Sequence, residues 1–312
     1  MYIHDDTGAR LIDDCIIIGA GPAGLTAAIY LARFHLSIRL FDSGSSRAAM
    51  IPCTHNHAGY PEGIAGKDLL GLMLAQAEKY GAHREAKKVT AIEPDGETFA
   101  VVTDHGRYRA RTVLLATGVV NHRPNIPPAV HDPALERGLF RYCPICDGYE
   151  VTDRRVGVIG TGDHGMREAL FLRGYTRDVT LISPEAEHLL DDACAAKLDE
   201  AGIARVQGPC GGWAIEGEQL AVDTARGRMA FDSVYPALGS RIRSRLAVAA
   251  GARATDEGCL EVDDHQRTTI PGLFAAGDVV KGLDQISHAI GEAGVAATTI
   301  RNLLSERQPI RR

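Results

Sequence analysis

No stretch of this 312-residue chain reaches about 18 consecutive apolar residues, the length that a helix needs to cross a bilayer, so we expect no membrane span. The chain also has no excess of basic residues, because 34 Lys and Arg face 40 Asp and Glu, giving a net charge of −6. That balance gives no electrostatic reason to expect nucleic-acid binding. The polar N-terminus lacks the basic and apolar segments of a secretion signal, and we expect a cytoplasmic protein.

Cysteines are few and scattered. Their number, seven, is odd and their spacing is unlike that of a secreted disulfide framework; only Cys143 and Cys146 lie close together. A structural zinc site would require a second compact pair of ligands, which the sequence lacks, so we predict no metal site. A C-x-x-C pair at the start of a helical turn is typical of a redox-active dithiol, because the helix end stabilises a thiolate. The alternative is a pair of inert buried thiols.

Three glycines near the N-terminus follow a short apolar run at 14–18 and precede a helical stretch at 25–34: Gly19, Gly21 and Gly24. A second apolar run, 37–41, ends at Asp42, which lies 23 residues past the first glycine. Strand, glycine turn, helix and strand in this order are typical of a dinucleotide site. The glycines permit a tight turn and a close approach to a diphosphate, to which the helix N-terminus offers N–H groups. A carboxylate at the end of the second strand can accept hydrogen bonds from ribose hydroxyls.

The same pattern recurs in the middle of the chain. Three more glycines follow an apolar run at 155–159: Gly160, Gly162 and Gly165. A helical stretch at 166–175 and a further strand at 178–182 come next. One GxGxxG motif is a weak signal, but two of them, each between a strand and a helix, predict two dinucleotide-binding units. The alternative for each motif is an ordinary glycine-rich turn of an α/β protein.

Further strands are predicted between the two repeats and near the C-terminus. Residues 98–118 indicate two short strands around a turn, followed by a third strand that ends at Thr117 and Gly118. A later strand closes on Asp278, and a final helix is expected at about 286–304.

Taken together, these motifs resemble the low-molecular-weight thioredoxin reductases of the pyridine nucleotide–disulfide oxidoreductase family. Five segments carry the resemblance, in the family's order and over nearly the whole chain: GAGPAGLTAAIYLAR, ATG, CPICDGYE, GTGDHGMREALFL and PGLFAAGDVV. The resemblance implies an α/β fold of two doubly wound Rossmann-like dinucleotide-binding domains, one inserted in the other. A discontinuous FAD-binding domain would span 1–123 and 246–312, and an inserted NAD(P)-type domain with the C-x-x-C pair would span 124–245. It also implies a homodimer.

The resemblance implies which residues contact the cofactors. Those expected to contact FAD are Gly19, Gly21, Gly24, Asp42, Asn56, Thr117, Gly118, Asp278, Gln285 and Ile286. Those expected to contact a nicotinamide nucleotide are Gly160, Gly162 and Gly165. Within the FAD set, Asn56 would face the flavin, Asp278 would bind the ribityl chain or a phosphate, and the helix after Gln285 would direct its N-terminus at the flavin.

The resemblance also implies roles in catalysis. Cys146 would face the flavin, Cys143 would attack the disulfide of the partner, and Asp147 would protonate the leaving thiolate. For Asp147, an ordinary acid in the first turn of a helix is the alternative. Four histidines could each be a base or an ordinary loop or helix residue, and their roles stay open: His55, His57, His164 and His288.

One segment departs from the family pattern. Thioredoxin reductases that use NADPH carry a basic HRRxxxR-type stretch after the second strand of the inserted domain, whereas residues 181–188 contain no arginine. Ser183 stands where the first repeat has its ribose-binding acid, and Glu185 and Glu187 follow. A serine can accept a hydrogen bond from a ribose hydroxyl but supplies no charge for a phosphate. We therefore expect NAD(P)H to bind, without a strong preference for NADPH.

Three functions fit these observations. The leading one is an FAD-dependent, thioredoxin-reductase-like disulfide oxidoreductase that passes electrons through Cys143–Cys146 to a thioredoxin-like protein or a small disulfide. The second is a dithiol oxidase that forms a disulfide in a small molecule, with oxygen as acceptor. The third is an electron-transfer flavoprotein with a ferredoxin-like donor. The sequence leaves the disulfide substrate, the electron donor and the physiological direction open.

Overall fold

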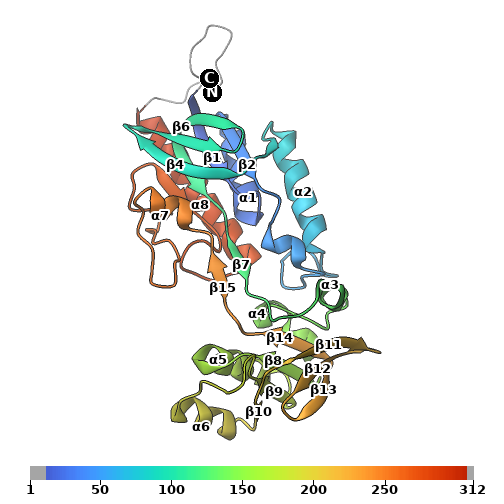
Figure 1. The fold of residues 1–312 in the computed structure, drawn as a ribbon. Helices are drawn as coiled ribbons and strands as arrows, with labels where there is room; N and C mark the ends of the chain where they lie inside the picture. The colour runs from blue at the N-terminus through green and yellow to red at the C-terminus, as the bar shows by residue number, and fades with distance from the viewer. Residues whose placement is uncertain (1–11, 308–312) are drawn as a thin grey trace. The chain divides into compact units, whose positions relative to one another are not determined.

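A computed structural model describes residues 12–307, which form two compact units (Figure 1). The first unit consists of the described residues up to Ile51, of Ala65–Val120 and of the residues from Arg241 onward. The second consists of Pro52–Ile64 and Asn121–Ser240, so most of it is inserted in the sequence of the first. The loop Pro52–Ile64 groups with the second unit, although the sequence prediction assigns it to the FAD-binding domain.

The first unit contains a seven-stranded sheet in the order β3-β2-β1-β6-β5-β4, with β16 beside β6. Its strands are β1 (Ile12–Ile18), β2 (Ile38–Asp42), β3 (Arg84–Ala86), β4 (Val89–Asp95), β5 (Thr98–Thr103), β6 (Gly106–Leu115) and β16 (Leu273–Ala275). The pairings β4–β5 and β5–β6 are antiparallel, and the other pairings are parallel. The end of β1 is apolar and fully buried, as expected for a central parallel strand, and its Cys15 lies in the core.

The strand β6 differs from the prediction, which divides residues 106–118 between two strands. Gly106–Leu115 is one continuous strand. Its first half pairs antiparallel with β5, and its second half pairs parallel with β1 as far as Ile18 and Leu115. Arg109 and Ala110 pair with both β1 and β5, and the strand continues through Arg111 without interruption.

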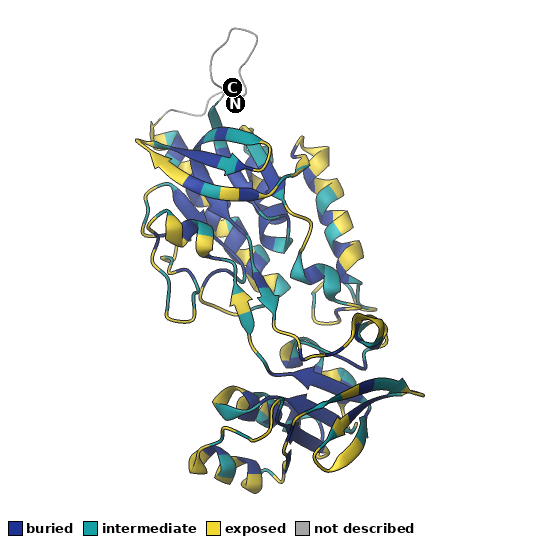
Figure 2. Ribbon diagram, viewed as in Figure 1, coloured by how far each residue is buried: buried dark blue, intermediate teal, exposed yellow. Residues whose placement is uncertain are grey.

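The helices of the first unit are α1 (Pro22–Arg33), α2 (Gly66–Lys79), α7 (Arg245–Ala249) and α8 (Ile286–Arg307), with the 3-10 turn η1 (Arg47–Met50). The helix α8 begins at the predicted residue and ends three residues later than predicted. α1 and α8 pack against each other, and both bury small side chains completely: Ala27, Ala28, Ala293, Ala296 and Ala297. Figure 2 shows the buried positions of both helices in dark blue. Small side chains shorten the distance at which two helices can pack.

The second unit is built around a parallel sheet in the order β10-β9-β8-β14. These strands are β8 (Val156–Ile159), β9 (Val179–Ile182), β10 (Ala204–Val206) and β14 (Ser233–Pro236). Its helical segments are α3 (Pro128–Glu136), α4 (Pro144–Asp147), η2 (Gly148–Val151), α5 (Gly162–Arg173) and α6 (Asp192–Glu200). An antiparallel sheet adds β11 (Gly211–Glu216), β12 (Gln219–Thr224) and β13 (Gly227–Phe231). β7 (Val119–Asn121) pairs with β15 (Ser240–Ile242), where the chain passes between the units.

Each unit places a glycine loop between a parallel strand and a helix, which confirms the predicted α/β class. Within residues 12–307, no helix combines the length and hydropathy of a membrane span. In the same part of the chain, no three His, Cys, Asp or Glu side chains are grouped so that they could hold a metal ion.

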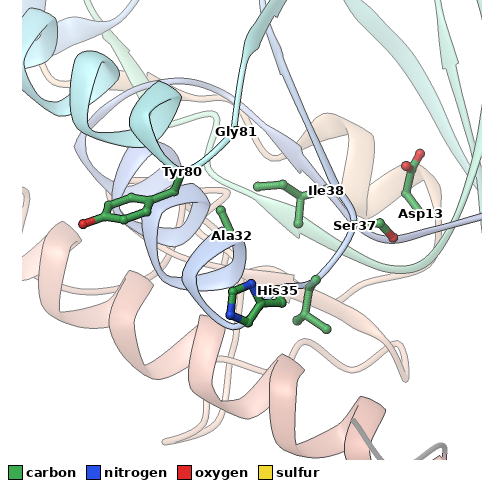
Figure 3. Close-up of a pocket in the computed structure, with 8 residues that line it drawn as sticks. Asp13, Ala32, His35, Ser37, Ile38, Tyr80 and Gly81 are labelled. Carbon is green, nitrogen blue, oxygen red and sulfur yellow. The ribbon is translucent and has the colours of Figure 1, made fainter. Parts of the chain in front are cut away.

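A shallow depression lies at the start of β2, close to the ends of α1 and α2 (Figure 3). Its lining residues are Asp13, Ala32, His35, Leu36, Ser37, Ile38, Tyr80 and Gly81. Ligands of parallel α/β sheets bind at the carboxyl ends of the strands. The depression lies at the amino ends of β1 and β2, so it is at the opposite edge of the sheet from Gly19.

Glu168 on α5 is a buried carboxyl without a partner for its Oε2 atom among residues 12–307. Burial raises the pKa of Glu168 from 4.5 to about 7. Because the pKa of Glu168 is higher in the folded than in the unfolded protein, its protonation stabilises the folded state. This contribution to the free energy of unfolding is fully present below pH 4.5 and is lost as the pH rises through about 7. At about 1.4 kcal/mol per pKa unit, the loss approaches about 3 kcal/mol.

We therefore expect Glu168→Gln to remove this pH dependence. Urea unfolding at several pH values between 4.5 and 8 measures it, and Glu200→Gln, which changes an exposed residue at the end of α6, is the matched control. A wild-type stability profile as flat as that of Glu168→Gln would show that the carboxyl is solvated.

Candidate active site

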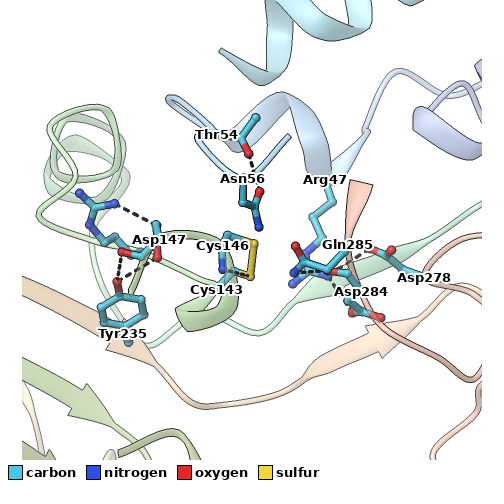
Figure 4. Close-up of a disulfide and its surroundings, with 11 residues drawn as sticks. Arg47, Thr54, Asn56, Cys143, Cys146, Asp147, Tyr235, Asp278, Asp284 and Gln285 are labelled. Carbon is cyan, nitrogen blue, oxygen red and sulfur yellow. Dashed lines mark hydrogen bonds and ion pairs between the residues drawn. A yellow bond between two sulfur atoms is a disulfide. The ribbon is translucent and has the colours of Figure 1, made fainter. Parts of the chain in front are cut away.

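Cys143 and Cys146 form a disulfide at the start of α4, with their Cα atoms 5.2 Å apart (Figure 4). Cys143 is the N-cap residue, and the backbone N–H of Cys146 donates to its Sγ at 3.2 Å. Pro144 follows at the first helical position, where a residue without an N–H costs no hydrogen bond. The pair therefore lies at the start of a helical turn, as predicted, and the helix N-terminus favours a thiolate at Cys143.

Asp147, at the end of α4, is held by two side chains (Figure 4). The hydroxyl of Tyr235 donates to its Oδ1 at 2.9 Å, and the guanidinium of Arg141 donates to its Oδ2 at 3.0 Å. Burial raises the pKa of the Asp147 carboxyl, whereas Arg141 and Tyr235 act in the opposite direction. The carboxyl thus has a fixed orientation and keeps its proton to a higher pH than an exposed aspartic acid, as a proton donor requires.

Sequence reasoning missed both partners of Asp147. Arg141 stands two residues before Cys143, so its position beside the pair was a usable signal. Tyr235 lies on β14, 88 residues from Asp147, and no local pattern connects the two. Its side chain is fully buried, and its hydroxyl also donates to the carbonyl oxygen of Asp147 at 3.2 Å.

The first glycine loop has the backbone geometry that a diphosphate requires. Gly19 has φ +107°, and a Cβ there would lie 2.3 Å from the carbonyl oxygen of Ala116. A Cβ on Gly24 would lie 1.8 Å from the carbonyl oxygen of Gly19. Gly21, in contrast, has only the Ser46 hydroxyl nearby, and no side chain caps the N-terminus of α1. The loop has no space for side chains where strand and helix meet. It has free space beside Gly21, where phosphate oxygens would lie.

Asp42 ends β2 beside this loop, as predicted. Its Oδ1 accepts from the backbone N–H of Ala20 at 3.1 Å, and its Oδ2 accepts from that of Gly44 at 2.8 Å. The carboxylate therefore joins the glycine loop to the turn after β2. Each carboxylate oxygen has further acceptor capacity, so these bonds are compatible with ribose binding.

Asp278 lies after β16 and is bound to a cation that the sequence did not reveal (Figure 4). The guanidinium of Arg47 donates to Asp278 Oδ2 at 3.1 Å and to Asp284 Oδ2 at 2.8 Å. Burial raises the pKa of Asp284, and Asp278 acts in the same direction, so Arg47 supplies the compensating charge. Gln285 follows Asp284 and immediately precedes α8.

Thr117 and Gly118 lie beside a second arginine that was missed. The hydroxyl of Thr117 donates to the carbonyl oxygen of Arg243 at 2.8 Å, and Gly118 has φ +61°. The guanidinium of Arg243 donates to the carbonyl oxygen of Ser45 at 3.0 Å. Arg47 and Arg243 thus give this part of the first unit two cations suited to a diphosphate.

The second glycine loop also leaves no room for side chains, although its contacts are less close than those of the first. A Cβ on Gly160 would lie 2.9 Å from that of Ala237, and one on Gly165 would lie 2.8 Å from the carbonyl carbon of Gly160. Gly162 has φ +62° and begins α5. The hydroxyl of Thr161, however, already accepts from the backbone N–H of Leu189 at 2.6 Å. The segment after β9 therefore lies against this loop.

Ser183 stands at the end of β9, at the position that corresponds to the ribose-binding acid of the first repeat. Its side chain is fully buried, and its hydroxyl donates to the carbonyl oxygen of Glu187 at 3.0 Å. The hydroxyl holds the segment 183–187 in a closed turn and does not face solvent.

Asn56 lies in the loop Pro52–Ile64, where its Oδ1 accepts from the Thr54 hydroxyl at 2.9 Å (Figure 4). The four histidines whose roles were open have different surroundings. His57 stacks on Tyr60, His164 is exposed, and the imidazole of His288 contacts Glu292 on α8. His55 contacts Glu150.

The chain matches the family model described as pyridine nucleotide-disulphide oxidoreductase over residues 13–293. It is 33% identical over 308 residues to the thioredoxin reductase of Listeria monocytogenes serovar 1/2a (strain ATCC BAA-679 / EGD-e), with 95% of each chain covered. The thioredoxin reductase of Streptococcus pyogenes MGAS5005 has a TM-score of 0.86 at 28% identity, covering 95% of this chain and 99% of its own. The structure of HlmI has a TM-score of 0.87 at 29% identity, covering 98% and 95%. The chain therefore belongs to the pyridine nucleotide-disulphide oxidoreductase family, as a thioredoxin-reductase-like flavin disulfide oxidoreductase with the redox pair Cys143–Cys146.

Proposed function

We propose that the protein passes electrons from a reduced nicotinamide through FAD and the Cys143–Cys146 pair to the disulfide of a thioredoxin-like protein. The observation that carries the proposal is the disulfide at the start of α4, with the buried carboxyl of Asp147 in the same turn. The relatives from Listeria monocytogenes and Streptococcus pyogenes are thioredoxin reductases, which supports a thioredoxin-like partner. The resemblance to that family also supports a homodimer.

The residues of the first unit fit FAD. Gly19, Gly21 and Gly24 would receive the diphosphate at the N-terminus of α1, with Asp42 on the ribose. Arg47 would turn from Asp278 and Asp284 toward a phosphate. Thr117 and Gly118 would line the adjacent turn, and Gln285 and Ile286 would lie along the flavin ring. FAD, when bound, exchanges two electrons with the dithiol, and the N-terminus of α8 would stabilise negative charge on the ring.

The dithiol carries the reduction of the partner. The Cys143 thiolate attacks one sulfur of the partner disulfide, a mixed disulfide forms, and the other sulfur leaves as a thiolate. Asp147 gives its proton to that leaving thiolate. The Cys146 thiolate then attacks the Cys143 sulfur and breaks the bond to the partner, which restores the Cys143–Cys146 disulfide and releases the second partner sulfur as a thiolate.

We predict that NADH donates electrons to the flavin at least as well as NADPH does. Residues 181–188 carry no arginine, and each missing charge-assisted contact to a phosphate forgoes about 1.5–3 kcal/mol. Loss of two contacts corresponds to about a hundredfold or more in affinity. Glu185 and Glu187 are exposed and would repel a phosphate dianion. We therefore expect anaerobic flavin reduction by NADH to match or exceed that by NADPH at equal concentration.

An advantage of tenfold or more for NADPH would contradict this prediction and would indicate a substitute cation. Arg205 on β10 is the first residue to examine in that case, because β10 pairs with β9 and the Arg205 guanidinium is bound to the exposed Asp199. Arg205→Met would then remove the NADPH preference.

A second function, oxidation of a small dithiol with oxygen as acceptor, is favoured by one observation. The backbone N–H of Leu189 donates to the hydroxyl of Thr161 beside the second glycine loop, so a nucleotide would have to share this hydroxyl with Leu189. The same anaerobic titration separates the functions. Reduction of the flavin by dithiothreitol but by neither nicotinamide supports the dithiol oxidase, and reduction by a ferredoxin-like protein alone supports an electron-transfer flavoprotein.

A further inference from the structure

A cysteine outside the redox pair lies at one end of a Cys–His–Glu series in the second unit. Cys53 is an exposed free cysteine, and its Sγ lies 3.6 Å from Nε2 of His55. The other ring nitrogen of His55, Nδ1, lies 2.8 Å from Oε1 of Glu150. A nucleophile, a base and a carboxylate that orients the base are therefore in the order that activates a thiol.

The loop Pro52–Ile64 has a backbone that brings the sulfur and the imidazole together. Thr54 and Ile64 form an antiparallel bridge, with N–H to O distances of 2.9 and 3.0 Å. In an extended segment alternate side chains share a face, so Cys53 and His55 project to one side of the buried Thr54.

The absence of a side chain at Gly63 provides the space that the Cys53 sulfur and the His55 imidazole occupy. It has φ +74°, and a Cβ there would lie 2.5 Å from the sulfur of Cys53 and 2.7 Å from Cδ2 of His55. Any other residue would displace both side chains. The contact between sulfur and imidazole therefore depends on a glycine at this position.

Glu150 belongs to η2, the turn that follows α4 and its redox pair. Its side chain is mostly buried, and its Oε2 atom has no hydrogen-bond partner among residues 12–307. An uncompensated buried carboxylate oxygen is costly, so the bond to His55 is the main compensation that Glu150 receives. It fixes the N–H of His55 at Nδ1 and leaves Nε2 as the acceptor that faces Cys53.

We propose that Cys53, His55 and Glu150 form a second thiol site, which reacts with small disulfides such as glutathione disulfide and does not need the Cys143–Cys146 pair. His55 Nε2 takes the proton of the Cys53 thiol. The thiolate attacks one sulfur of the disulfide, a Cys53–S–S–R bond forms, and the original S–S bond breaks. Its electron pair leaves with the second sulfur, which takes the proton from His55. No further oxidant is required.

Two simpler interpretations do not account for the arrangement. In the described part of the chain, no group of three His, Cys, Asp or Glu could hold a metal ion, so the series is not a metal site. The other four free cysteines are buried or partly buried, and burial raises the pKa of Cys15 to about 12 and that of Cys210 to about 11. Those four lack the exposure that Cys53 has.

The test uses the full-length, FAD-loaded protein with Cys143–Cys146 kept oxidised, so that the pair cannot react. Glutathione disulfide is added at pH 7, the reaction is quenched with acid, and the mixed disulfide on each cysteine is measured by peptide mass spectrometry. We expect modification at Cys53, with His55→Gln about tenfold slower because an unassisted thiol is only a few per cent thiolate. Glu150→Gln is expected to lie between the two.

His57→Gln is the matched control, because it changes a histidine of the same loop and should leave the rate within about twofold. Added imidazole should restore the rate of His55→Ala, which a purely structural role of His55 would not permit. Equal rates for wild type and His55→Gln, or equal modification of Cys53 and the partly buried Cys259, would overturn the proposal. Since the nicotinamide donors are absent from this assay, failure of the proposed reductase function would not affect its outcome.

Discussion

Replacement of either cysteine of the redox pair is expected to abolish turnover with a disulfide substrate, while FAD stays bound and reducible. Each serine variant lacks one of the two sulfurs between which the Cys143–Cys146 bond must form and break. The two variants should differ in their spectra. Only the sulfur that faces the flavin can interact with it, so Cys143→Ser, which keeps Cys146, should show a thiolate-to-flavin charge-transfer band that Cys146→Ser lacks.

The measurement is an absorption spectrum of each FAD-loaded variant, together with the rate of disulfide reduction. Cys259→Ser is the matched control, because Cys259 is a partly buried free cysteine of the first unit. A charge-transfer band in Cys146→Ser and not in Cys143→Ser would reverse the two roles. Turnover that survives in both variants would remove the pair from the mechanism.

Replacement of Asp147 by asparagine is expected to slow disulfide exchange by about a hundredfold or more, the range lost with a general acid. Burial raises the pKa of Asp147, and the acid donates only while it is protonated. The exchange rate should therefore fall as the pH rises through that pKa, and Asp147→Asn should lose this pH-dependent step.

The partners of Asp147 permit a sharper test. The guanidinium of Arg141 and the hydroxyl of Tyr235 both favour the ionised carboxylate, so Arg141→Met or Tyr235→Phe should raise the pKa of Asp147 further. The falling part of the pH profile should then move to higher pH. A purely structural effect would lower the rate equally at every pH.

Exchange is best measured by stopped flow, with the reduced enzyme and a disulfide substrate between pH 5 and 9. Asp199→Asn is the matched control, since it removes an exposed carboxylate that is bound to Arg205 in the same unit. A downward shift of the pH profile in Arg141→Met would contradict the assignment of Asp147 as the acid.

Features that depend on neighbouring residues were predicted correctly. The glycine loops, the helices α1 and α5 and the helical turn at Cys143 each arise from backbone conformations that a few consecutive residues specify, although α1 and α5 begin at Pro22 and Gly162, earlier than the predicted residues 25 and 166. The same holds for the first residue of α8. The continuous strand β6 was missed because its two halves pair with different strands, and strand pairing is not a local property.

The residues around the predicted sites could not be found in this way. Arg47 is 231 residues from Asp278, and Tyr235 is 88 residues from Asp147, so each contact exists only after two distant segments have been brought together. The bond between His55 and Glu150 likewise joins a loop to a turn far along the chain. Local sequence thus specified the fold class, the glycine loops and the redox pair. Long-range packing specified which charges and proton donors surround them, because burial and partner choice depend on residues that are remote in sequence.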